Sequence, residues 1–238
     1  MAHPTQSFVR NCLLSVVDAE GYAAIAPHLE PVDLPKGTVL IEADVPFSYA
    51  YFLNSGIGSI VVSTADGRPV EAGLFGQEGL SGFACLLGVD QCVQTTFMQV
   101  AGDGYRVPID ALRSACRQSE SLRETILRYV YVFISQTSAT TLSNANQAIE
   151  GRLARWLLMC HDRVTGDDVP LTHEFLSIML AVHRPSVTTA LNMIESYGFI
   201  RARRGHITII DRAALISFTD GTYGKPEAEY RRLIGPFG

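Results

Sequence analysis

Arginine side chains gather in one short stretch of the sequence, between Arg184 and Arg212. This stretch holds five Arg against only Glu195 and Asp211, whereas residues 1–145 hold eight Lys and Arg against fourteen Asp and Glu. Guanidinium groups bind phosphates and the acceptor edge of guanine through paired hydrogen bonds. A locally basic face can bind DNA in a chain of net charge −5, because salt makes phosphate attraction short-ranged. The charge pattern therefore indicates a DNA-binding face near the C-terminus.

Two short helices are predicted to position these arginines. Thr172 is an N-cap residue type for a helix that begins at His173, and the small Ala181 stands where two helices turn closely. The second helix opens with Arg184 and Pro185, since proline is tolerated in a first helical turn. The apolar face of the first helix would consist of Phe175, Leu176, Met179 and Leu180. That of the second helix would consist of Val187, Ala190, Leu191 and Ile194.

A basic hairpin is predicted directly after the second helix. Gly198 suits the end of that helix, and residues 199–202 and 206–210 read as two strands joined at Arg204 and Gly205. An amphipathic helix is also predicted over residues 149–163, before these two helices. Three helices followed by a hairpin form a winged helix-turn-helix. The predicted DNA-binding residues are Thr172, His183, Arg184, Ser186, Thr188, Thr189, Arg201, Arg203 and Arg204. The alternative is a small α+β domain with solvated surface arginines.

The middle of the chain has the pattern of an antiparallel β-domain. Short β-rich runs alternate with glycine-containing turns about every ten residues, which is typical of a sandwich or jelly roll. The runs are residues 38–41, 49–53, 58–63, 70–75, 95–100 and 104–107. Such a domain could bind a small molecule or have no ligand at all.

Helices are predicted on both sides of the β-domain. The apolar spacing indicates one helix over residues 8–29 and one long helix over residues 109–147, where Gly and Pro are absent. The long helix is too apolar for an exposed linker, so it would pack on the β-domain or against a second copy of the chain. We expect a β-domain with an N-terminal helix over residues 1–115 and a dimerisation helix over residues 116–147. A winged helix-turn-helix would follow over residues 148–215, and a tail over residues 216–238.

The whole chain resembles the Crp/Fnr family of bacterial transcription regulators. The most specific part runs from Thr172 through Arg184-Pro-Ser-Val to Leu191, and continues with Ile194-Glu and Gly198-Phe-Ile. The resemblance implies an α+β fold with a β-roll like that of cyclic-nucleotide-binding domains, a long dimerisation helix and a C-terminal winged helix-turn-helix. It implies a homodimer that binds a near-palindromic site in double-stranded DNA and contacts RNA polymerase. Pro185 replaces the family's acidic second recognition residue, so the family's best-known base preference should not transfer.

The sensor half resembles the family in outline only. Residues 75–81 resemble the start of the phosphate-binding cassette, but Leu80 replaces the glutamate that holds the ribose in cyclic-nucleotide binders. Residues 94–97 contain no arginine to pair with a cyclic phosphate. We therefore expect an effector other than cyclic AMP, or none. The candidate effector-pocket residues are Gly76, Glu78, Gly79, Leu80, Gln94, Thr95 and Thr96.

Other functions have little support in the sequence. The five cysteines are scattered, with no CxxC pair, which argues against disulfides, zinc and iron–sulfur clusters. A role for Cys85, Cys92 or Cys116 as a redox switch remains open. Residues 30–115 contain no His, so a cupin-like metal enzyme is not expected, nor any cofactor. No signal peptide or membrane span is apparent, so we expect a cytoplasmic protein. The main alternative is a ligand-binding or protein-interaction module that has lost its ability to bind DNA.

Overall fold

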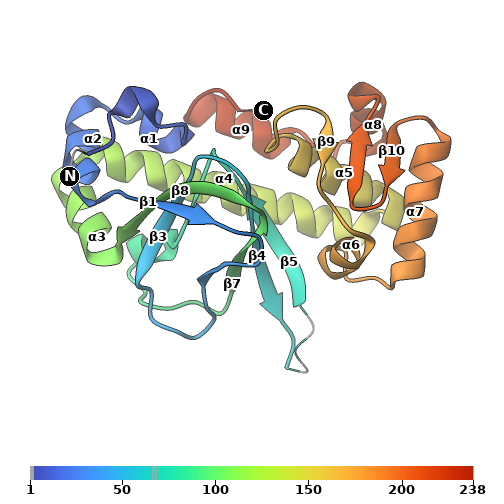
Figure 1. The fold of residues 1–238 in the computed structure, drawn as a ribbon, viewed down its shortest axis with the longest axis horizontal. Coiled ribbons are helices and arrows are strands. Elements are labelled where there is room, and N and C mark those ends of the chain that lie inside the picture. Colours follow the sequence, from blue (N-terminus) through green and yellow to red (C-terminus); the bar gives the residue numbers. More distant parts are fainter. Residues whose placement is uncertain (1–2, 66, 68, 238) are drawn as a thin grey trace.

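The computed structural model describes residues 3–65, 67 and 69–237, and it shows two halves joined by one long helix (Figure 1). The N-terminal half is a roll of two antiparallel sheets, and the C-terminal half packs helices around a small sheet. Helix α4 (Glu120–Asn146) runs behind the roll toward the C-terminal half. This is the α+β architecture that the sequence predicts.

Two four-stranded sheets form the β-roll. The strand order of the first is β1 (Glu30–Leu34), β8 (Gly102–Pro108), β3 (Tyr49–Leu53) and β6 (Leu80–Ser81). The strand order of the second is β2 (Val39–Ile41), β7 (Thr95–Val100), β4 (Ile57–Ser63) and β5 (Pro69–Phe75). All pairs are antiparallel, so alternate side chains of each strand point into the roll. The core of the roll includes Leu34, Leu40, Leu53, Ile60, Phe75 and Met98.

The N-terminal segment departs from the single helix expected over residues 8–29. The chain forms two short helices, α1 (Cys12–Val16) and α2 (Ala19–Ile25), with 3-10 turns at Gln6–Phe8 and Ala26–His28. The side chains of Asn11 and Asp18 each accept a hydrogen bond from a backbone N–H three residues ahead, so each begins a new helix. The prediction of one continuous helix was therefore wrong.

A second cap divides the helical region after the roll. One helix is expected over residues 109–147, but α3 (Ile109–Gln118) ends before Ser119, and α4 begins after it. Ser119 has extended backbone angles, and its hydroxyl accepts a hydrogen bond from the N–H of Leu122 at 3.1 Å. A serine that caps a new helix gives no apolar signal, so the periodicity could not locate this break.

The C-terminal half begins with α5 (Ile149–His161). It continues with β9 (Asp168–Val169), α6 (His173–Met179), α7 (Arg184–Ser196), β10 (Ile200–Arg203), β11 (His206–Ile209) and α8 (Arg212–Phe218). The three strands form one antiparallel sheet in the order β10-β11-β9. The fully buried side chains of this half include Leu153, Leu157, Leu176, Val187, Leu191, Ile194 and Leu215.

The two halves share one apolar core. Val61 and Leu74 of the roll lie in the same buried cluster as Leu157 of α5 and Met179 of α6. The rings of Phe97 and Phe175 meet edge to face with centroids 6.3 Å apart. Apolar surface buried in this way holds the C-terminal half against the roll.

The tail, whose structure is not predictable from its loosely periodic sequence, folds back over the molecule. Helix α9 (Lys225–Leu233) packs on α4 and lies between α1 and the C-terminal half in Figure 1. Tyr230 is 1 % exposed, and its hydroxyl donates to the carbonyl of Glu78 at 2.9 Å. Within the described parts of the chain, no helix combines the length and apolar character that a bilayer span requires.

Candidate DNA-binding site

Helix α6 and the turn after it set the direction in which the second helix starts. The Thr172 hydroxyl accepts a hydrogen bond from the N–H of Phe175 at 3.2 Å, which caps α6 as the sequence predicts. Ala181 follows α6 with a φ of +52°, in the left-handed region. Large or β-branched side chains are disfavoured there, which explains the small residue at this sharp turn.

Helix α7 is amphipathic and begins at Arg184. Pro185 lies in the first turn, where its missing N–H needs no intrahelical partner. The fully buried side chains follow the pattern i, i+3, i+4 and i+7, at Val187, Ala190, Leu191 and Ile194. This spacing puts them on one face, so the opposite face of the helix is left to solvent.

The predicted contact residues lie at the N-cap and in the first two turns of α7. His183, Arg184, Thr188 and Thr189 are exposed, and Ser186 is half-buried. The hydroxyls of Thr188 and Thr189 bond to backbone carbonyls one turn back, at 3.2 and 3.1 Å. The N-terminus of a helix carries a partial positive charge, which favours a phosphate.

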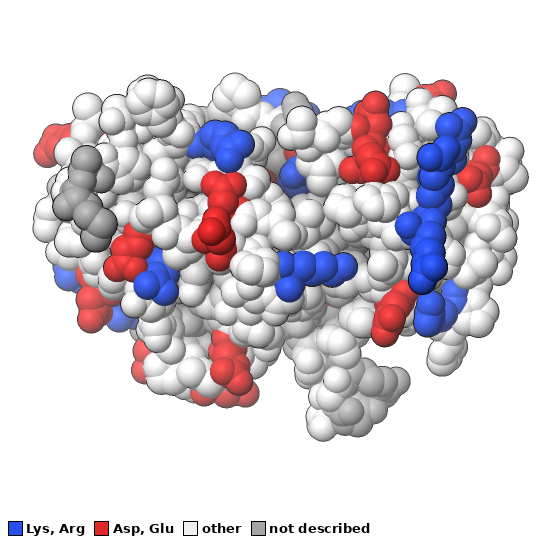
Figure 2. All heavy atoms as spheres, viewed as in Figure 1, with Lys and Arg blue, Asp and Glu red and all other residues white. Residues whose placement is uncertain are grey.

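The hairpin of β10 and β11 places three more arginines beside α7. Arg201 and Arg203 are exposed and two positions apart on β10, so they project from the same face of the strand. Arg204 is exposed at the turn, where Gly205 has a φ of +79°. Figure 2 shows a band of Lys and Arg side chains on this end of the molecule, over the region that Figure 1 assigns to the hairpin and α7. This surface matches the shape and charge of a winged helix-turn-helix.

Two histidines of this surface were missed by the sequence analysis. The Nδ1 atom of His173 lies 3.2 Å from the hydroxyl of Thr188, which links α6 to the exposed face of α7. His206 pairs with Arg203 across the hairpin, and its Nδ1 atom lies 2.9 Å from a carboxylate oxygen of Asp168. The predicted turn at Arg204 and Gly205 already implied that residues 203 and 206 face each other.

The effector-pocket candidates separate into two groups. A cavity of about 310 Å³ lies between the roll and α4, and Gln94 and Thr96 line it. Thr95 points to the other face of β7, because side chains alternate along a strand. The remaining candidates, which do not line this cavity, are Gly76, Glu78, Gly79 and Leu80.

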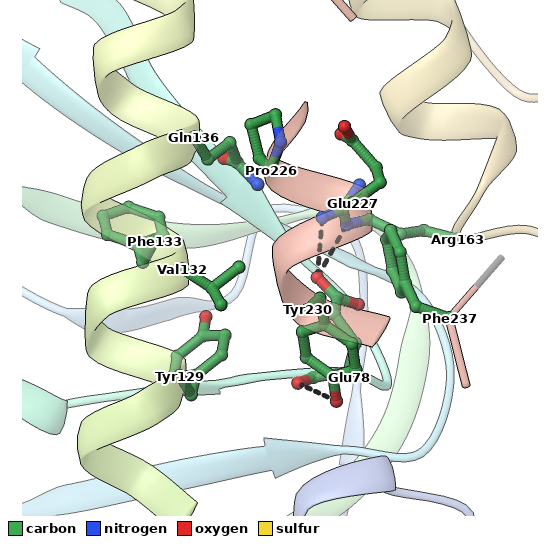
Figure 3. Close-up of a pocket in the computed structure, with 10 residues that line it drawn as sticks. All are labelled: Glu78, Tyr129, Val132, Phe133, Gln136, Arg163, Pro226, Glu227, Tyr230 and Phe237. Carbon is green, nitrogen blue, oxygen red and sulfur yellow. Dashed lines mark hydrogen bonds and ion pairs between the residues drawn. The ribbon is translucent and has the colours of Figure 1, made fainter. Parts of the chain in front are cut away.

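The segment that contains Glu78 faces the tail instead of the cavity. Its carboxylate lies 2.7 Å from the guanidinium of Arg163, and both side chains are only 3 % exposed. Figure 3 shows this ion pair beside Tyr230 and Phe237, and the Arg163 guanidinium lies 5.1 Å from the centroid of the Phe237 ring. Glu78 therefore does not line the cavity between the roll and α4, and its charge joins the two halves, so its role as an effector residue stays a prediction.

The cysteines described by the structure are all free thiols. Burial raises the pKa of Cys85 to about 11 and that of Cys116 to about 12. A thiol with a raised pKa forms little of the reactive thiolate. The suggested redox role of these two residues therefore has no support from their surroundings.

Comparisons with known proteins agree with this geometry. Residues 151–218 match the model of the Crp-like helix-turn-helix domain. The chain is 26 % identical over 211 residues to a CRP-like cAMP-activated global transcriptional regulator of Mycobacterium tuberculosis. That match covers 84 % of this chain and 92 % of the relative.

Solved structures share the fold. FixK2 from Bradyrhizobium japonicum superimposes with a TM-score of 0.70 at 15 % identity, covering 80 % of this chain and 96 % of that one. A CRP-family transcriptional regulator from Thermus thermophilus gives a TM-score of 0.68 at 18 % identity, covering 80 % and 97 %. At these identities the likeness shows the architecture of roll, long helix and helix-turn-helix.

Proposed function

Because this chain is a transcription regulator of the Crp/Fnr family with a helix-turn-helix DNA-binding domain, and not an enzyme, we propose that it binds a near-palindromic DNA site as a homodimer. In this proposal α7 enters the major groove and the hairpin contacts the neighbouring backbone. The observation that carries it is the place of Arg184, which is exposed in the first turn of α7, with the exposed Thr188 and Thr189 one turn further along.

Arg184→Ala is expected to weaken binding to the specific site by roughly 1–3 kcal/mol, because it removes paired hydrogen bonds to a base or a phosphate clamp. The site would first be selected from random duplexes with the wild-type chain. Fluorescence anisotropy would then measure the affinity for that site and for an unrelated duplex, each at two salt concentrations.

The hairpin supplies a contrasting variant in the same assay. Arg203→Gln with Arg204→Gln should weaken binding to both duplexes alike and reduce the salt slope by about one unit for each phosphate that the variant no longer neutralises. Arg232→Ala, an exposed arginine of α9, serves as the control and should bind like the wild type. If the Arg184 and hairpin variants also bind both duplexes like the wild type, this face does not contact DNA, and a module that does not bind DNA becomes the better interpretation.

A stripe along α4 supports the proposed dimer. Its members alternate at spacings of four and three, as in the seam of a two-stranded coiled coil. All are exposed except the half-buried first one, and they are Leu127, Tyr131, Ile134, Ser138, Thr141 and Ala145. The small side chains at the later positions would let two helices approach closely. An exposed stripe of apolar and small side chains on a long helix is covered when two copies pair.

Thr141→Glu is expected to convert the dimer into monomers. Two carboxylates would face each other in the seam, where burial without partners costs several kcal/mol each. Sedimentation velocity would measure the change, and we expect the dissociation constant of the dimer to rise at least roughly a hundredfold. Asn146→Glu is the matched control, because residue 146 is exposed but lies about 100° around the helix from residue 145. Equal behaviour of the two variants would place the dimer contact elsewhere.

Further partners follow from the proposed role. A regulator of this family acts on transcription, so we include RNA polymerase among its proposed partners. Because it acts on the DNA of a bacterium, we place it in the cytoplasm.

We also propose that any effector of the roll is not cyclic AMP. The cavity between the roll and α4 has Gln94 and Thr96 in its lining, and Leu80 stands apart from it in β6. A cyclic phosphate buried there would lose its hydration without gaining a charged partner.

A further inference from the structure

The cavity is enclosed by three elements. The register of the second sheet sets Thr96 of β7 opposite Ile60 of β4 on one side and Ile41 of β2 on the other, so the three side chains share one face. Helix α4 covers this face with Val130, Phe133, Ile134 and Thr137, which lie on one side of the helix. The 3-10 segment Phe83–Leu87 forms the remaining wall.

The lining is uncharged. Of the fourteen described residues that line the cavity, none is Lys, Arg, His, Asp or Glu, and most are aliphatic or aromatic. An ionised group placed here would lose its hydration and find no counter-charge among the lining residues. The volume of about 310 Å³ is at the small end of ligand pockets, which suits a molecule of one or two rings.

The hydroxyl of Thr96 has no hydrogen-bond partner among the residues that the structure describes. Thr96 as a residue is only 4 % exposed, although its hydroxyl oxygen is not fully shielded from solvent. The hydroxyl of Thr137 is different, because it donates to the carbonyl of Ile134 at 2.8 Å. A threonine hydroxyl can both donate and accept, so the Thr96 hydroxyl is available to a molecule in the cavity.

We propose that this cavity binds an uncharged, largely apolar small molecule anchored by one hydrogen bond to the Thr96 hydroxyl. Leu87 and Ile134 line the cavity and are each more than half exposed, so the ligand enters between the 3-10 segment and α4. Ile134 also belongs to the proposed dimer stripe. The role of this molecule as an effector rests on the proposed function, whereas its binding can be measured without DNA.

The test compares two probes that differ only in their polar group. Calorimetric titration of the intact chain with 1-naphthol should show one site per chain. Naphthalene-1-sulfonate and cyclic AMP should bind at least roughly tenfold more weakly, because both carry a charge. The inference is overturned if 1-naphthol shows no saturable binding, or if the sulfonate binds equally well.

Two variants locate the site. Thr96→Val keeps the volume but removes the hydroxyl, so affinity for 1-naphthol should fall roughly three- to tenfold while affinity for naphthalene stays unchanged. Ala84→Trp should fill the cavity and abolish binding of both probes. A thermal melt and the DNA-binding assay confirm that each variant is folded. Wild-type affinity in both variants would place the probe elsewhere and overturn the inference. If the wild-type chain binds 1-naphthol but does not bind DNA, only the proposed function is contradicted.

Discussion

Replacing Arg163 by Met is expected to lower the free energy of unfolding by about 3–5 kcal/mol, because it leaves the carboxylate of Glu78 buried without its counter-charge. One Glu78 oxygen accepts from Arg163, and the other accepts from the N–H of Gly76 at 3.0 Å. Burial alone would lower the pKa of the Arg163 guanidinium, but the carboxylates of Glu78 and Asp162 raise it, so the group stays charged. Urea unfolding at pH 7 measures the loss.

Two further variants show whether burial is the cause. Adding Glu78→Gln to Arg163→Met removes the stranded charge but keeps an acceptor for Gly76, so at least half of the lost stability should return. Arg232 and Glu229 also lie 2.7 Å apart, but 63 % and 31 % of their side chains are exposed, so Arg232→Met should have a far smaller effect. Equal losses from Arg163→Met and Arg232→Met would contradict the argument.

The location of this ion pair explains what the loss of stability would do to the structure. Glu78 belongs to the roll, Arg163 follows α5, and the tail covers both through Tyr230 and Phe237 (Figure 3). The pair therefore fixes the DNA-binding half relative to the sensor half. Mutation of Arg163 should loosen that arrangement before it disturbs either core.

The DNA-binding half could be predicted because its signals are local. Thr172, Ala181 and the apolar positions of α7 lie within about two dozen residues, and each acts through its own helix or turn. The apolar spacing fixes which face of α7 is buried, so it also shows that Thr189 points to solvent. The helix break at Ser119 could not be predicted, because serine is common both in loops and at helix N-caps.

The ion pair that connects the two halves could not be predicted, since its two residues are far apart in the sequence. Glu78 and Arg163 are 85 positions apart, and nothing in either local pattern indicates a buried pair. The motif around Glu78 resembles a ligand cassette, which made an effector contact the natural expectation. Only the fold of the tail over this segment shows that the carboxylate serves another purpose.

A second buried carboxylate, Glu71 of β5, connects the roll to α5. One of its oxygens accepts from the indole N–H of Trp156 at 2.6 Å, and the other lies 2.9 Å from the hydroxyl of Ser59. That hydroxyl also lies 2.7 Å from the amide oxygen of Gln99, so its one proton cannot serve both acceptors. If Glu71 is protonated, it donates to Ser59, and Ser59 donates to Gln99. The geometry thus accommodates the neutral acid.

The surroundings of Glu71 also raise its pKa. Burial raises the pKa of Glu71 from 4.5 to about 7, although hydrogen bonds from Trp156 and Ser59 and the charges of Arg163 and Arg155 oppose the rise. Below pH 4.5 the folded and unfolded states are both protonated. Between pH 4.5 and 7 only the unfolded chain ionises, so stability falls by about 1.4 kcal/mol per pH unit. Above pH 7 the full loss, on the order of 3 kcal/mol, persists.

Glu71→Gln is expected to remove this part of the pH dependence. Relative to the wild type, the variant should gain stability between pH 5 and pH 7 and keep the gain at pH 8, as measured by urea unfolding. Trp156 is the only tryptophan, so its fluorescence reports the Glu71 proton directly. The emission should titrate with a midpoint near pH 7 in the wild type and in Glu174→Gln, which changes an exposed carboxylate of α6, but not in Glu71→Gln. An unchanged titration in Glu71→Gln would show that another group carries it.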